Sequence, residues 1–303
     1  MRSGKWLRSL LFGFLLSSAL VLSLAANATA ATEPLRIGVF ADLHAHDTES
    51  PGEGKVMSNY SERLESFVVA ANAWPADLVI ELGDFVNGKF VLGAELGDAA
   101  RIPGILEKAE SIYATFGGPR YYVLGNHDVY DLSKEEFIER VDATSTYQSL
   151  DAGAYHVVIL DAQYDKKGND LGHAGWVVQG NIPQAQLDWL SEDLAATDLP
   201  TIVCVHQPLD VDFDLLSGGP AIANAEAVKA ILSGSGVVVA VFQGHEHENA
   251  YSEIDGIHYI TFEALVDHTE SVPPSWALVT LDPVSRTIDI EGAGMQADWH
   301  FEY

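Results

Sequence analysis

Cysteine is almost absent from this chain of 303 residues, because Cys204 is the only one. A single thiol excludes an intramolecular disulfide, so packing and hydrogen bonds must hold the fold together. Cys204 stands in the apolar run Thr201–Val205, where a thiol is usually a small buried apolar side chain. Nothing in its local sequence would lower its pKa, so we do not expect a catalytic cysteine.

Basic residues are also scarce. The 16 lysines and arginines stand against 44 acidic residues, which gives a formal net charge of −28 at pH 7. A surface of this sign repels nucleic acid and anionic membranes, so we expect no nucleic-acid partner. It would also repel an anionic substrate, unless bound divalent metal ions reverse the local charge.

Long apolar runs are missing after the amino-terminal segment, which is different. It opens with three basic residues, continues with an apolar run over about residues 9–26, and ends in a small-x-small motif at residues 28–30. This order is typical of a secretory signal peptide. We therefore predict a signal peptide at residues 1–30 and a secreted or periplasmic mature chain that begins near Ala31, without stable membrane association. An uncleaved membrane anchor is the alternative, because the run approaches the length that spans a bilayer.

No repeat, low-complexity tract or linker divides the remaining chain, so we expect a single domain over residues 31–303. Short runs that are rich in β-branched residues, with polar residues or glycine at their ends, predict buried strands. These runs are Leu35–Ala41, Leu78–Leu82, Tyr121–Leu124, His156–Leu160, Ile202–Val205 and Val237–Phe242, followed by Ile257–Phe262, Trp276–Leu281 and Thr287–Glu291.

Amphipathic segments alternate with these strands and predict helices. The first helix is indicated by an apolar face at Leu64, Phe67, Val68 and Ala71 before Pro75, and the second by a capping box at Ser133 and Glu136. The third is indicated by Pro183 at a first helical position before Leu187, Leu190 and Leu194. The fourth is indicated by Asn224 as a cap before Val228, Ile231 and Leu232. Alternating strands and helices predict an α/β layered fold.

Five short segments place Asp, Asn or His where a predicted strand ends. They are Asp42-Leu43-His44, Gly83-Asp84, Gly125-Asn126-His127-Asp128, His206-Gln207-Pro208 and Gly244-His245-Glu246-His247. In open α/β sheets, sites form beyond the carboxyl ends of strands, so these segments should converge. Imidazole nitrogen and carboxylate oxygen bind divalent metals such as Mn, Fe, Zn or Co, and a carboxylate has two oxygens with which it can bridge two ions. The glycines allow the backbone to approach an ion or a phosphate closely.

In this order, the five segments resemble the calcineurin-like metallophosphoesterase superfamily over about Ile37 to His247. The resemblance implies a layered β-sandwich flanked by helices, with a dinuclear site for two divalent metal ions at the carboxyl ends of the strands. The ligand set that it implies is Asp42, His44 and His247 for the first metal, Asn126, His206 and His245 for the second, and Asp84 as the bridge. A water or hydroxide shared by the ions would attack phosphorus in line.

The same resemblance implies two catalytic residues that do not bind metal. His127 would protonate the leaving-group oxygen, and Asp128 would set the orientation of His127. For five histidines outside the pattern we expect ordinary surface or core positions; they are His46, His156, His173, His268 and His300. Asp161 and Asp165, which follow a predicted strand, are interpreted as part of a solvated loop.

A finer resemblance concerns a branch of this superfamily, the manganese-dependent ADP-ribose and CDP-alcohol diphosphatases. The segments that carry it are Gly180–Leu190, His206–Pro208, Asn224–Glu226 and Gly256–Thr261. It implies a substrate in which a diphosphate or diester is joined to a nucleoside or alcohol. The chain departs from the diphosphatases of this branch at His44, where they carry glutamine, and this departure leaves the metal site intact.

We therefore expect an exported metal-dependent phosphoesterase that hydrolyses phosphodiester or pyrophosphate bonds of small organic phosphates. A phosphomonoesterase with the same dinuclear centre is the nearest alternative, because the metal motifs do not distinguish ester classes. A non-catalytic metal-binding scaffold is a third possibility. His127 argues against it, since a scaffold has no need of a leaving-group acid. The sequence does not indicate an oligomeric state.

Overall fold

The computed structural model describes residues 32–48, 57–88, 100–173, 179–211, 222–266 and 272–303. The predicted signal peptide and His268 lie outside the described residues. Within these ranges, no helix has both the length and the apolar character that crossing a membrane requires.

Two six-stranded sheets form the centre of the molecule. In spatial order, the first sheet consists of β12 (Trp299–Glu302), β11 (Thr287–Ala293), β10 (Trp276–Asp282), β1 (Leu35–Phe40), β2 (Leu78–Glu81) and β3 (Arg120–Tyr122). The second consists of β4 (Gln148–Ala152), β5 (Tyr155–Ile159), β6 (Thr201–Cys204), β7 (Val238–Gln243), β9 (Ile257–Thr261) and β8 (Ala250–Ile254). The strands β1, β2 and β3 pair in parallel, as do β5, β6, β7 and β9, so each sheet contains a parallel block.

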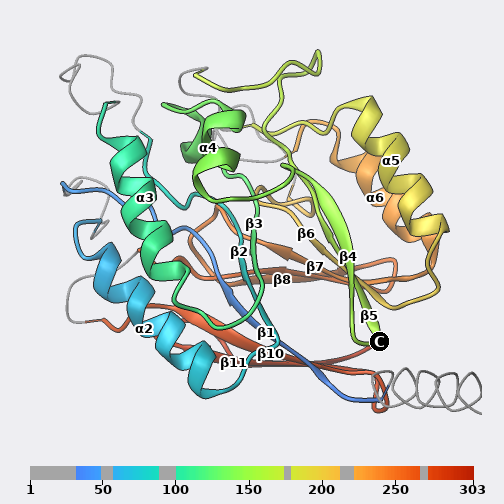
Figure 1. Cartoon of the computed structure of the whole chain (residues 1–303). Helices are drawn as coiled ribbons and strands as arrows, with labels where there is room; N and C mark the ends of the chain where they lie inside the picture. The colour runs from blue at the N-terminus through green and yellow to red at the C-terminus, as the bar shows by residue number, and fades with distance from the viewer. Residues whose placement is uncertain (1–31, 49–56, 89–99, 174–178, 212–221, 267–271) are drawn as a thin grey trace, which may run out of the picture.

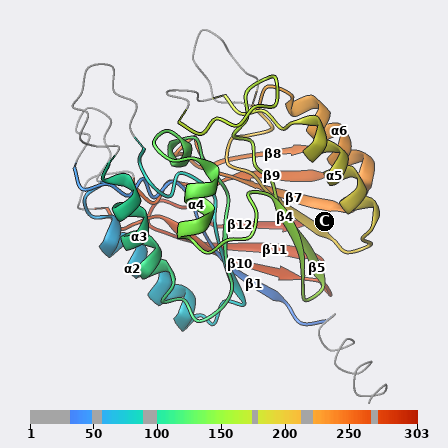
Figure 2. The same ribbon diagram turned by 45° about the horizontal axis from the view of Figure 1, so that its top comes forward.

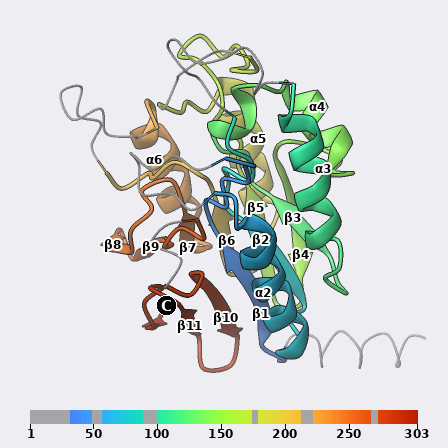
Figure 3. The same cartoon turned by 90° about the vertical axis from the view of Figure 1, so that its left-hand side faces the viewer.

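Helices cover the outer face of each sheet. On the first sheet lie α2 (Tyr60–Ala73), α3 (Ile102–Tyr113) and α4 (Lys134–Arg140), and on the second lie α5 (Gln184–Ala195) and α6 (Ala225–Ser235). Figure 1 shows α2 and α3 on one side of the molecule and α5 and α6 on the opposite side. In the turned view of Figure 2, β8, β9 and β7 lie above β12, β11 and β10. Figure 3 shows β10 and β11 to the left of β1, with α2 and α3 to its right.

The alternation of side chains along each strand builds the core. Val39 of β1 faces the apolar cluster between the two sheets, whereas its neighbour Phe40 packs with the residues of α2 and α3. In the same way, Val157 of β5 faces the other sheet and Val158 faces α5 and α6. Both faces of the parallel blocks are therefore buried, which explains why their strands are continuous apolar runs.

Cys204 lies in the core between the sheets and is fully buried, as its sequence context predicted. Burial raises the pKa of its thiol, because the apolar surroundings disfavour the thiolate. The thiol therefore has the properties of an inert packing group.

The structure confirms the layered α/β fold and every strand that the sequence predicted. The capping box is also present, because Ser133 Oγ accepts a hydrogen bond from Glu136 N and the Glu136 carboxylate accepts one from Ser133 N. Two caps differ from the prediction. Pro183 is the residue before α5 rather than its first residue. The Asn224 side chain bonds the backbone N–H and C=O of Ile182, so it ties two loops together instead of capping α6.

The strands that the sequence did not predict are the edge strands β4, β8 and β12. Their side chains are exposed or half-buried, and their sequences are correspondingly polar. The helix α3 was also missed, because its first turn contains a proline and a glycine. Local apolar patterning therefore identifies the apolar strands and misses the polar strands at three of the four sheet edges.

Candidate metal centre

The five loops that carry the candidate ligands follow β1, β2, β3, β6 and β7, where the parallel strands of both sheets end. Backbone hydrogen bonds join them within each sheet, since Asp42 N donates to Gly83 O (3.0 Å) and Gly244 N donates to His206 O (3.0 Å). A further bond joins the two sheets, from His245 N to Oδ2 of Asp42 (2.8 Å). The structure therefore brings together the segments whose convergence the sequence predicted.

Most of the candidate ligands occupy an unusual backbone conformation. The left-handed φ angles are 55° for Asp42, 45° for His44, 58° for Asp84, 73° for His245 and 61° for His247. Residues other than glycine rarely adopt this region, and where they do so in a cluster the strain is characteristic of functional sites. The fold therefore holds these side chains in positions that a relaxed turn would not provide.

Two glycines leave the space that the ligands occupy. A Cβ atom at Gly125 would lie 2.1 Å from Oδ1 of Asp84, and one at Gly83 would lie 2.3 Å from Nδ1 of His206. Gly83 also has a φ of 104°, which is strained for any other residue. At both positions a side chain would displace a candidate ligand.

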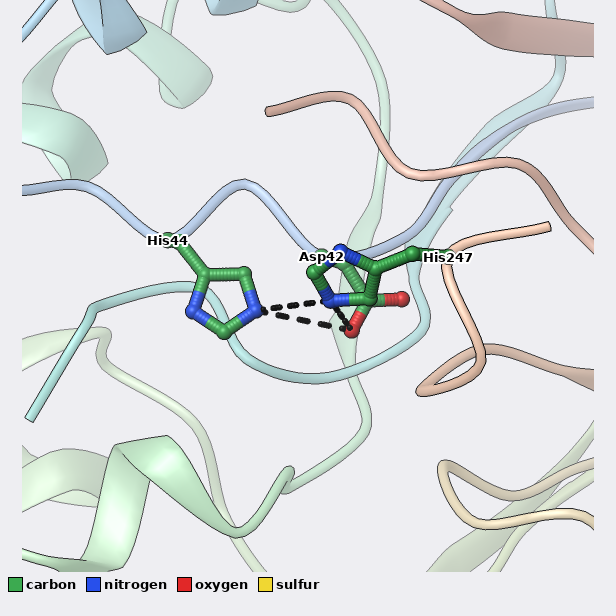
Figure 4. A group of neighbouring side chains, drawn as sticks. All are labelled: Asp42, His44 and His247. Atoms are coloured by element: carbon green, nitrogen blue, oxygen red, sulfur yellow. Dashed lines mark hydrogen bonds and ion pairs between the residues drawn. The ribbon is translucent and has the colours of Figure 1, made fainter. Parts of the chain in front are cut away.

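The first cluster consists of Asp42, His44 and His247 (Figure 4). Nε2 of His44 lies 3.0 Å from Nε2 of His247. Oδ1 of Asp42 lies 3.3 Å from Nε2 of His247 and 3.8 Å from Nε2 of His44. Three donor atoms from one loop of the first sheet and one loop of the second thus lie close together.

The second cluster consists of Asp84, His206 and His245. Nε2 of His206 lies 3.3 Å from Oδ2 of Asp84 and 3.0 Å from Nδ1 of His245. The same Oδ2 atom of Asp84 lies 3.5 Å from Nε2 of His44, which belongs to the first cluster. Asp84 therefore lies between the two clusters, as a bridging ligand must.

Hydrogen bonds on the far side of two rings determine which nitrogen faces the site. Nδ1 of His206 lies 2.8 Å from the carbonyl oxygen of Leu82, which can only accept a hydrogen bond. Nδ1 of His44 lies 2.8 Å from Oδ1 of Asn87, which is likewise an acceptor. In each neutral ring the proton is therefore on Nδ1, and the lone pair of Nε2 faces the cluster and is available to a metal.

Two buried oxygens show that the site fits cations. Oδ1 of Asp42 and Oδ1 of Asn126 are both buried and have no hydrogen-bond partner. Unpartnered buried oxygens are rare in proteins. A metal ion at each cluster would satisfy them, and it would also separate the histidine nitrogens that face each other. The donor set of carboxylate, amide oxygen and imidazole is the one that Mn, Fe, Zn and Co accept.

The electrostatics of the site favour deprotonated oxygen ligands. Burial alone would raise the pKa of Asp42, but His247 and His44 outweigh this effect and hold the pKa well below its ordinary value. Burial likewise opposes ionisation of Asp84, and His206 and His127 outweigh it and lower the pKa. Burial and the neighbouring His206 lower the pKa of His245 to about 3, so its ring is neutral and has a lone pair for a metal.

The candidate acid His127 lies beside the bridging residue. Its backbone N–H donates to Oδ1 of Asp84 (2.7 Å), and its ring Nδ1 lies 3.1 Å from the carbonyl oxygen of Gly88. The ring also packs against that of His44, with centroids 4.5 Å apart. A donor atom of His127 lies close enough to those of His44 and Asp84 to belong to a metal-binding group. Its assignment as an acid rather than a ligand therefore stays a prediction.

Asp128 is placed differently from the prediction that it orients the ring of His127. Its two carboxylate oxygens accept hydrogen bonds from the backbone amides of Asp84 (3.0 Å), Val86 (3.0 Å) and Gly125 (2.8 Å). Asp128 therefore fixes the two loops that carry Asp84 and Asn126. Through these bonds, Asp128 influences the position of His127 by fixing the backbone of the loops and not by contact with the imidazole ring.

Sequence reasoning missed three residues that support the site, namely Glu81, Asn87 and Tyr130. Oε1 of Glu81 accepts a hydrogen bond from Gly83 N (2.6 Å), and burial together with the charge of Asp128 raises the pKa of Glu81. Asn87 bonds His44, and the hydroxyl oxygen of Tyr130 accepts from Nδ2 of Asn126 (2.6 Å). The proximity of Asn87 and Tyr130 to the five motifs was the available signal, but their partners become visible only in the folded chain.

One residue that was assigned to a solvated loop is buried instead. Asp161 is fully buried, and its Oδ2 accepts a hydrogen bond from Nζ of Lys134 (2.7 Å), so that interpretation is wrong for Asp161. It is confirmed for Asp165, which organises an exposed turn through Lys167 and Asn169. Of the described histidines outside the pattern, three are buried (His46, His156 and His258) and two are exposed (His173 and His300), and none belongs to the metal-binding groups.

Comparison with known proteins agrees with this site. The chain matches the calcineurin-like phosphoesterase family over residues 35–249. It is 23% identical over 327 residues to the manganese-dependent ADP-ribose/CDP-alcohol diphosphatase of Arabidopsis thaliana, across 90% of this chain and 99% of the relative. The human protein of the same name is 24% identical over 326 residues, across 88% and 92% of the two chains.

A solved structure confirms the fold. The dimetal phosphatase LOC 393393 from Danio rerio superposes with a TM-score of 0.74 at 17% sequence identity, over 89% of this chain and 100% of that chain. Its likeness supports the layered architecture.

The family match includes all five loops that carry the candidate ligands. The family match and the geometry of the two clusters therefore agree on one class of enzyme, a phosphohydrolase that depends on two divalent metal ions. The chain belongs to the calcineurin-like phosphoesterase family.

Proposed function

We propose that this chain hydrolyses the diphosphate bond of small molecules in which a diphosphate joins a nucleoside to a sugar or an alcohol, as in ADP-ribose and CDP-alcohols. The observation that carries the proposal is the extent of the match to diphosphatases of that specificity. It covers 90% of this chain and 99% of the Arabidopsis protein, so it includes much more than the metal-binding loops.

The chain contributes a preorganised set of groups to this reaction. When bound, two divalent ions supply Lewis-acid activation of water and a clamp on the phosphoryl oxygens. Asp84 lies between the clusters, and its Oδ1 accepts a hydrogen bond from the backbone N–H of His127 (2.7 Å). Because Nδ1 of His127 faces the Gly88 carbonyl, Nε2 is the atom that delivers a proton to the leaving-group oxygen.

A metal centre would make the charge of the protein compatible with an anionic substrate. A formal net charge of −28 repels a diphosphate from the general surface. Two divalent cations at the clusters reverse that sign locally and attract the substrate to the site. Removal of the metals is therefore expected to weaken substrate binding as well as to abolish turnover.

A substrate panel tests the proposal. The purified, manganese-loaded protein is assayed on ADP-ribose, CDP-choline, bis-p-nitrophenyl phosphate and p-nitrophenyl phosphate, with the Asp84→Asn variant as the control for contaminating activity. We expect kcat/KM to be highest on the two diphosphates. A higher value on the monoester would replace this proposal by a phosphomonoesterase with the same centre.

We also propose that the protein acts outside the cytoplasm. The basic start, apolar run and small-x-small motif of residues 1–30 support cleavage near Ala31. The intact mass of the protein from the medium or periplasm of its host tests this proposal, and a chain that starts within a few residues of Ala31 is expected. Full-length chain in the membrane fraction would favour the membrane anchor.

A further inference from the structure

Tyr130 contacts both the candidate metal ligand Asn126 and the candidate acid His127. It directly follows the short 3₁₀ helix η1 (His127–Val129) and is 7% exposed. Its hydroxyl oxygen lies 2.6 Å from Nδ2 of Asn126. The centroid of its ring lies 4.7 Å from that of His127, with 49° between the planes.

The hydroxyl bonds the NH₂ end of the Asn126 amide. An asparagine amide presents an oxygen acceptor on one side and two N–H donors on the other. Since Nδ2 donates to the Tyr130 hydroxyl, Oδ1 is held on the opposite side, where it is buried and has no hydrogen-bond partner. The reversed amide would present N–H groups to the cation, and these cannot act as ligands.

The ring of Tyr130 limits the movement of His127. The imidazole packs against the ring of His44, at 4.5 Å and 79°, and against the ring of Tyr130. Its Nδ1 lies 3.1 Å from the Gly88 carbonyl oxygen, so the two rings and this bond together surround it. Burial raises the pKa of the Tyr130 hydroxyl, so this group stays protonated and neutral.

We propose that Tyr130 is a positioning residue with two separable actions: its hydroxyl orients the Asn126 amide for the metal, and its ring holds His127 against the leaving-group side of the site. The first action depends only on the metal centre. The second rests on the proposed function, because it concerns delivery of a proton to a leaving group.

Two substitutions separate these actions. Tyr130→Phe removes the hydroxyl and keeps the ring, whereas Tyr130→Leu removes both. Manganese affinity and stoichiometry are measured by calorimetry on metal-free protein. Alkyl and p-nitrophenyl diesters are then compared at saturating manganese. For Tyr130→Phe we expect the affinity of one of the two metal sites to fall about 10–100-fold, the usual effect of removing a partner of a metal ligand. The rate ratio between the two diesters should equal that of the wild type.

For Tyr130→Leu we expect the same loss of metal affinity together with a larger relative loss on the alkyl ester, because its leaving group needs the proton. Tyr122→Phe is the matched control. Tyr122 is also 7% exposed, and its hydroxyl donates to Glu110 rather than to the metal centre. It should leave both metal affinities unchanged.

Three results would overturn the proposal. If Tyr130→Phe bound manganese with wild-type affinity at both sites, the hydroxyl would have no role in orienting Asn126. If Tyr122→Phe weakened manganese binding as much as Tyr130→Phe does, the effect would be a general one on the fold. An unchanged diester ratio in Tyr130→Leu would remove the ring's role. The calorimetric result does not depend on the substrate, so it remains decisive if the diphosphatase activity is absent.

Discussion

Oδ2 of Asp84 lies 3.3 Å from Nε2 of His206, and the two residues follow strands of different sheets. The same oxygen lies 3.5 Å from Nε2 of His44 in the other cluster. One carboxylate is thus shared by both halves of the centre, so its charge acts on both metals.

Replacement of the shared carboxylate should therefore affect both metal sites. In Asp84→Asn we expect both metals to bind more weakly and hydrolysis to be almost abolished, because the amide removes the negative charge that both ions share. His247→Ala removes a ligand of one cluster only and should weaken a single site. Metal stoichiometry by elemental analysis distinguishes the two variants. Retention of two tightly bound ions in Asp84→Asn would contradict the bridging assignment.

His127→Ala should separate the acid from the ligands. We expect it to keep both metals and most of the substrate affinity while kcat falls about 10²–10⁴-fold on an alkyl ester, the usual worth of a positioned acid. The loss on a p-nitrophenyl ester should be far smaller, because p-nitrophenolate leaves without a proton.

The metal content of His127→Ala decides between two assignments. His127 lies close enough to His44 and Asp84 to act as a ligand itself. Loss of a metal in the variant would therefore identify it as one. Equal rate losses on both esters with full metal content would show that His127 orients the phosphate, and that another group donates the proton.

The convergence of the candidate ligands could be predicted from the sequence, because each of them follows a strand whose apolar run is visible in the sequence. Strands such as Ile202–Val205 are apolar on both faces, so their ends are visible in the sequence, and parallel strands place those ends together. Asp42 and His206 could therefore be assigned to one place although they are far apart in the chain.

The supporting contacts could not be predicted in this way. Asn87 and Tyr130 act through single hydrogen bonds whose partners are fixed by the folded loops. Asp161 follows a strand and precedes polar residues, which suggested a loop in water. The neutralising Lys134 comes from a helix of the other layer, and a sequence pattern does not show a contact of that kind.

Lys134 and Asp161 form a buried ion pair whose disruption should destabilise the fold. Nζ of Lys134 lies 2.7 Å from Asp161 and 2.9 Å from Asp170, and the Lys134 side chain is 4% exposed. Lys134→Met leaves the Asp161 carboxylate buried without its cation, which costs about 3–5 kcal/mol of unfolding free energy. Urea unfolding measures this cost.

Two further variants test the origin of that cost. Adding Asp161→Asn to Lys134→Met removes the buried charge and should restore part of the stability. Arg101→Met removes the cation of the exposed Arg101–Asp47 pair and should change stability by less than about 1 kcal/mol. A cost for Lys134→Met as small as that for Arg101→Met would show that the buried pair does not stabilise the fold.

His156 should make the stability of the protein depend on pH. Nδ1 of His156 lies 2.7 Å from Asp151, and Nε2 lies 2.9 Å from Asp193 of α5. Burial opposes the charged ring, but Asp193 and Asp151 outweigh it and raise the pKa above the ordinary value of 6.5. The folded protein therefore holds this proton more tightly than the unfolded chain does. The resulting stabilisation is fully present below pH 6.5 and is lost as the pH rises through the raised pKa.

The variant His156→Gln isolates this contribution, because glutamine keeps hydrogen-bonding capacity and does not titrate in this range. We expect the unfolding free energy of the wild type, measured in urea at saturating metal, to fall more steeply above pH 6.5 than that of His156→Gln. His300→Gln is the control, since His300 pairs with Asp289 at 2.6 Å in an exposed position where solvent screens the charges. Asp289 also raises the pKa of His300, but solvent screens this exposed pair, so we expect the slope of His300→Gln to lie closer to that of the wild type than the slope of His156→Gln does. Identical slopes for the wild type and His156→Gln would show that the two carboxylates do not stabilise a charged His156 in the folded protein.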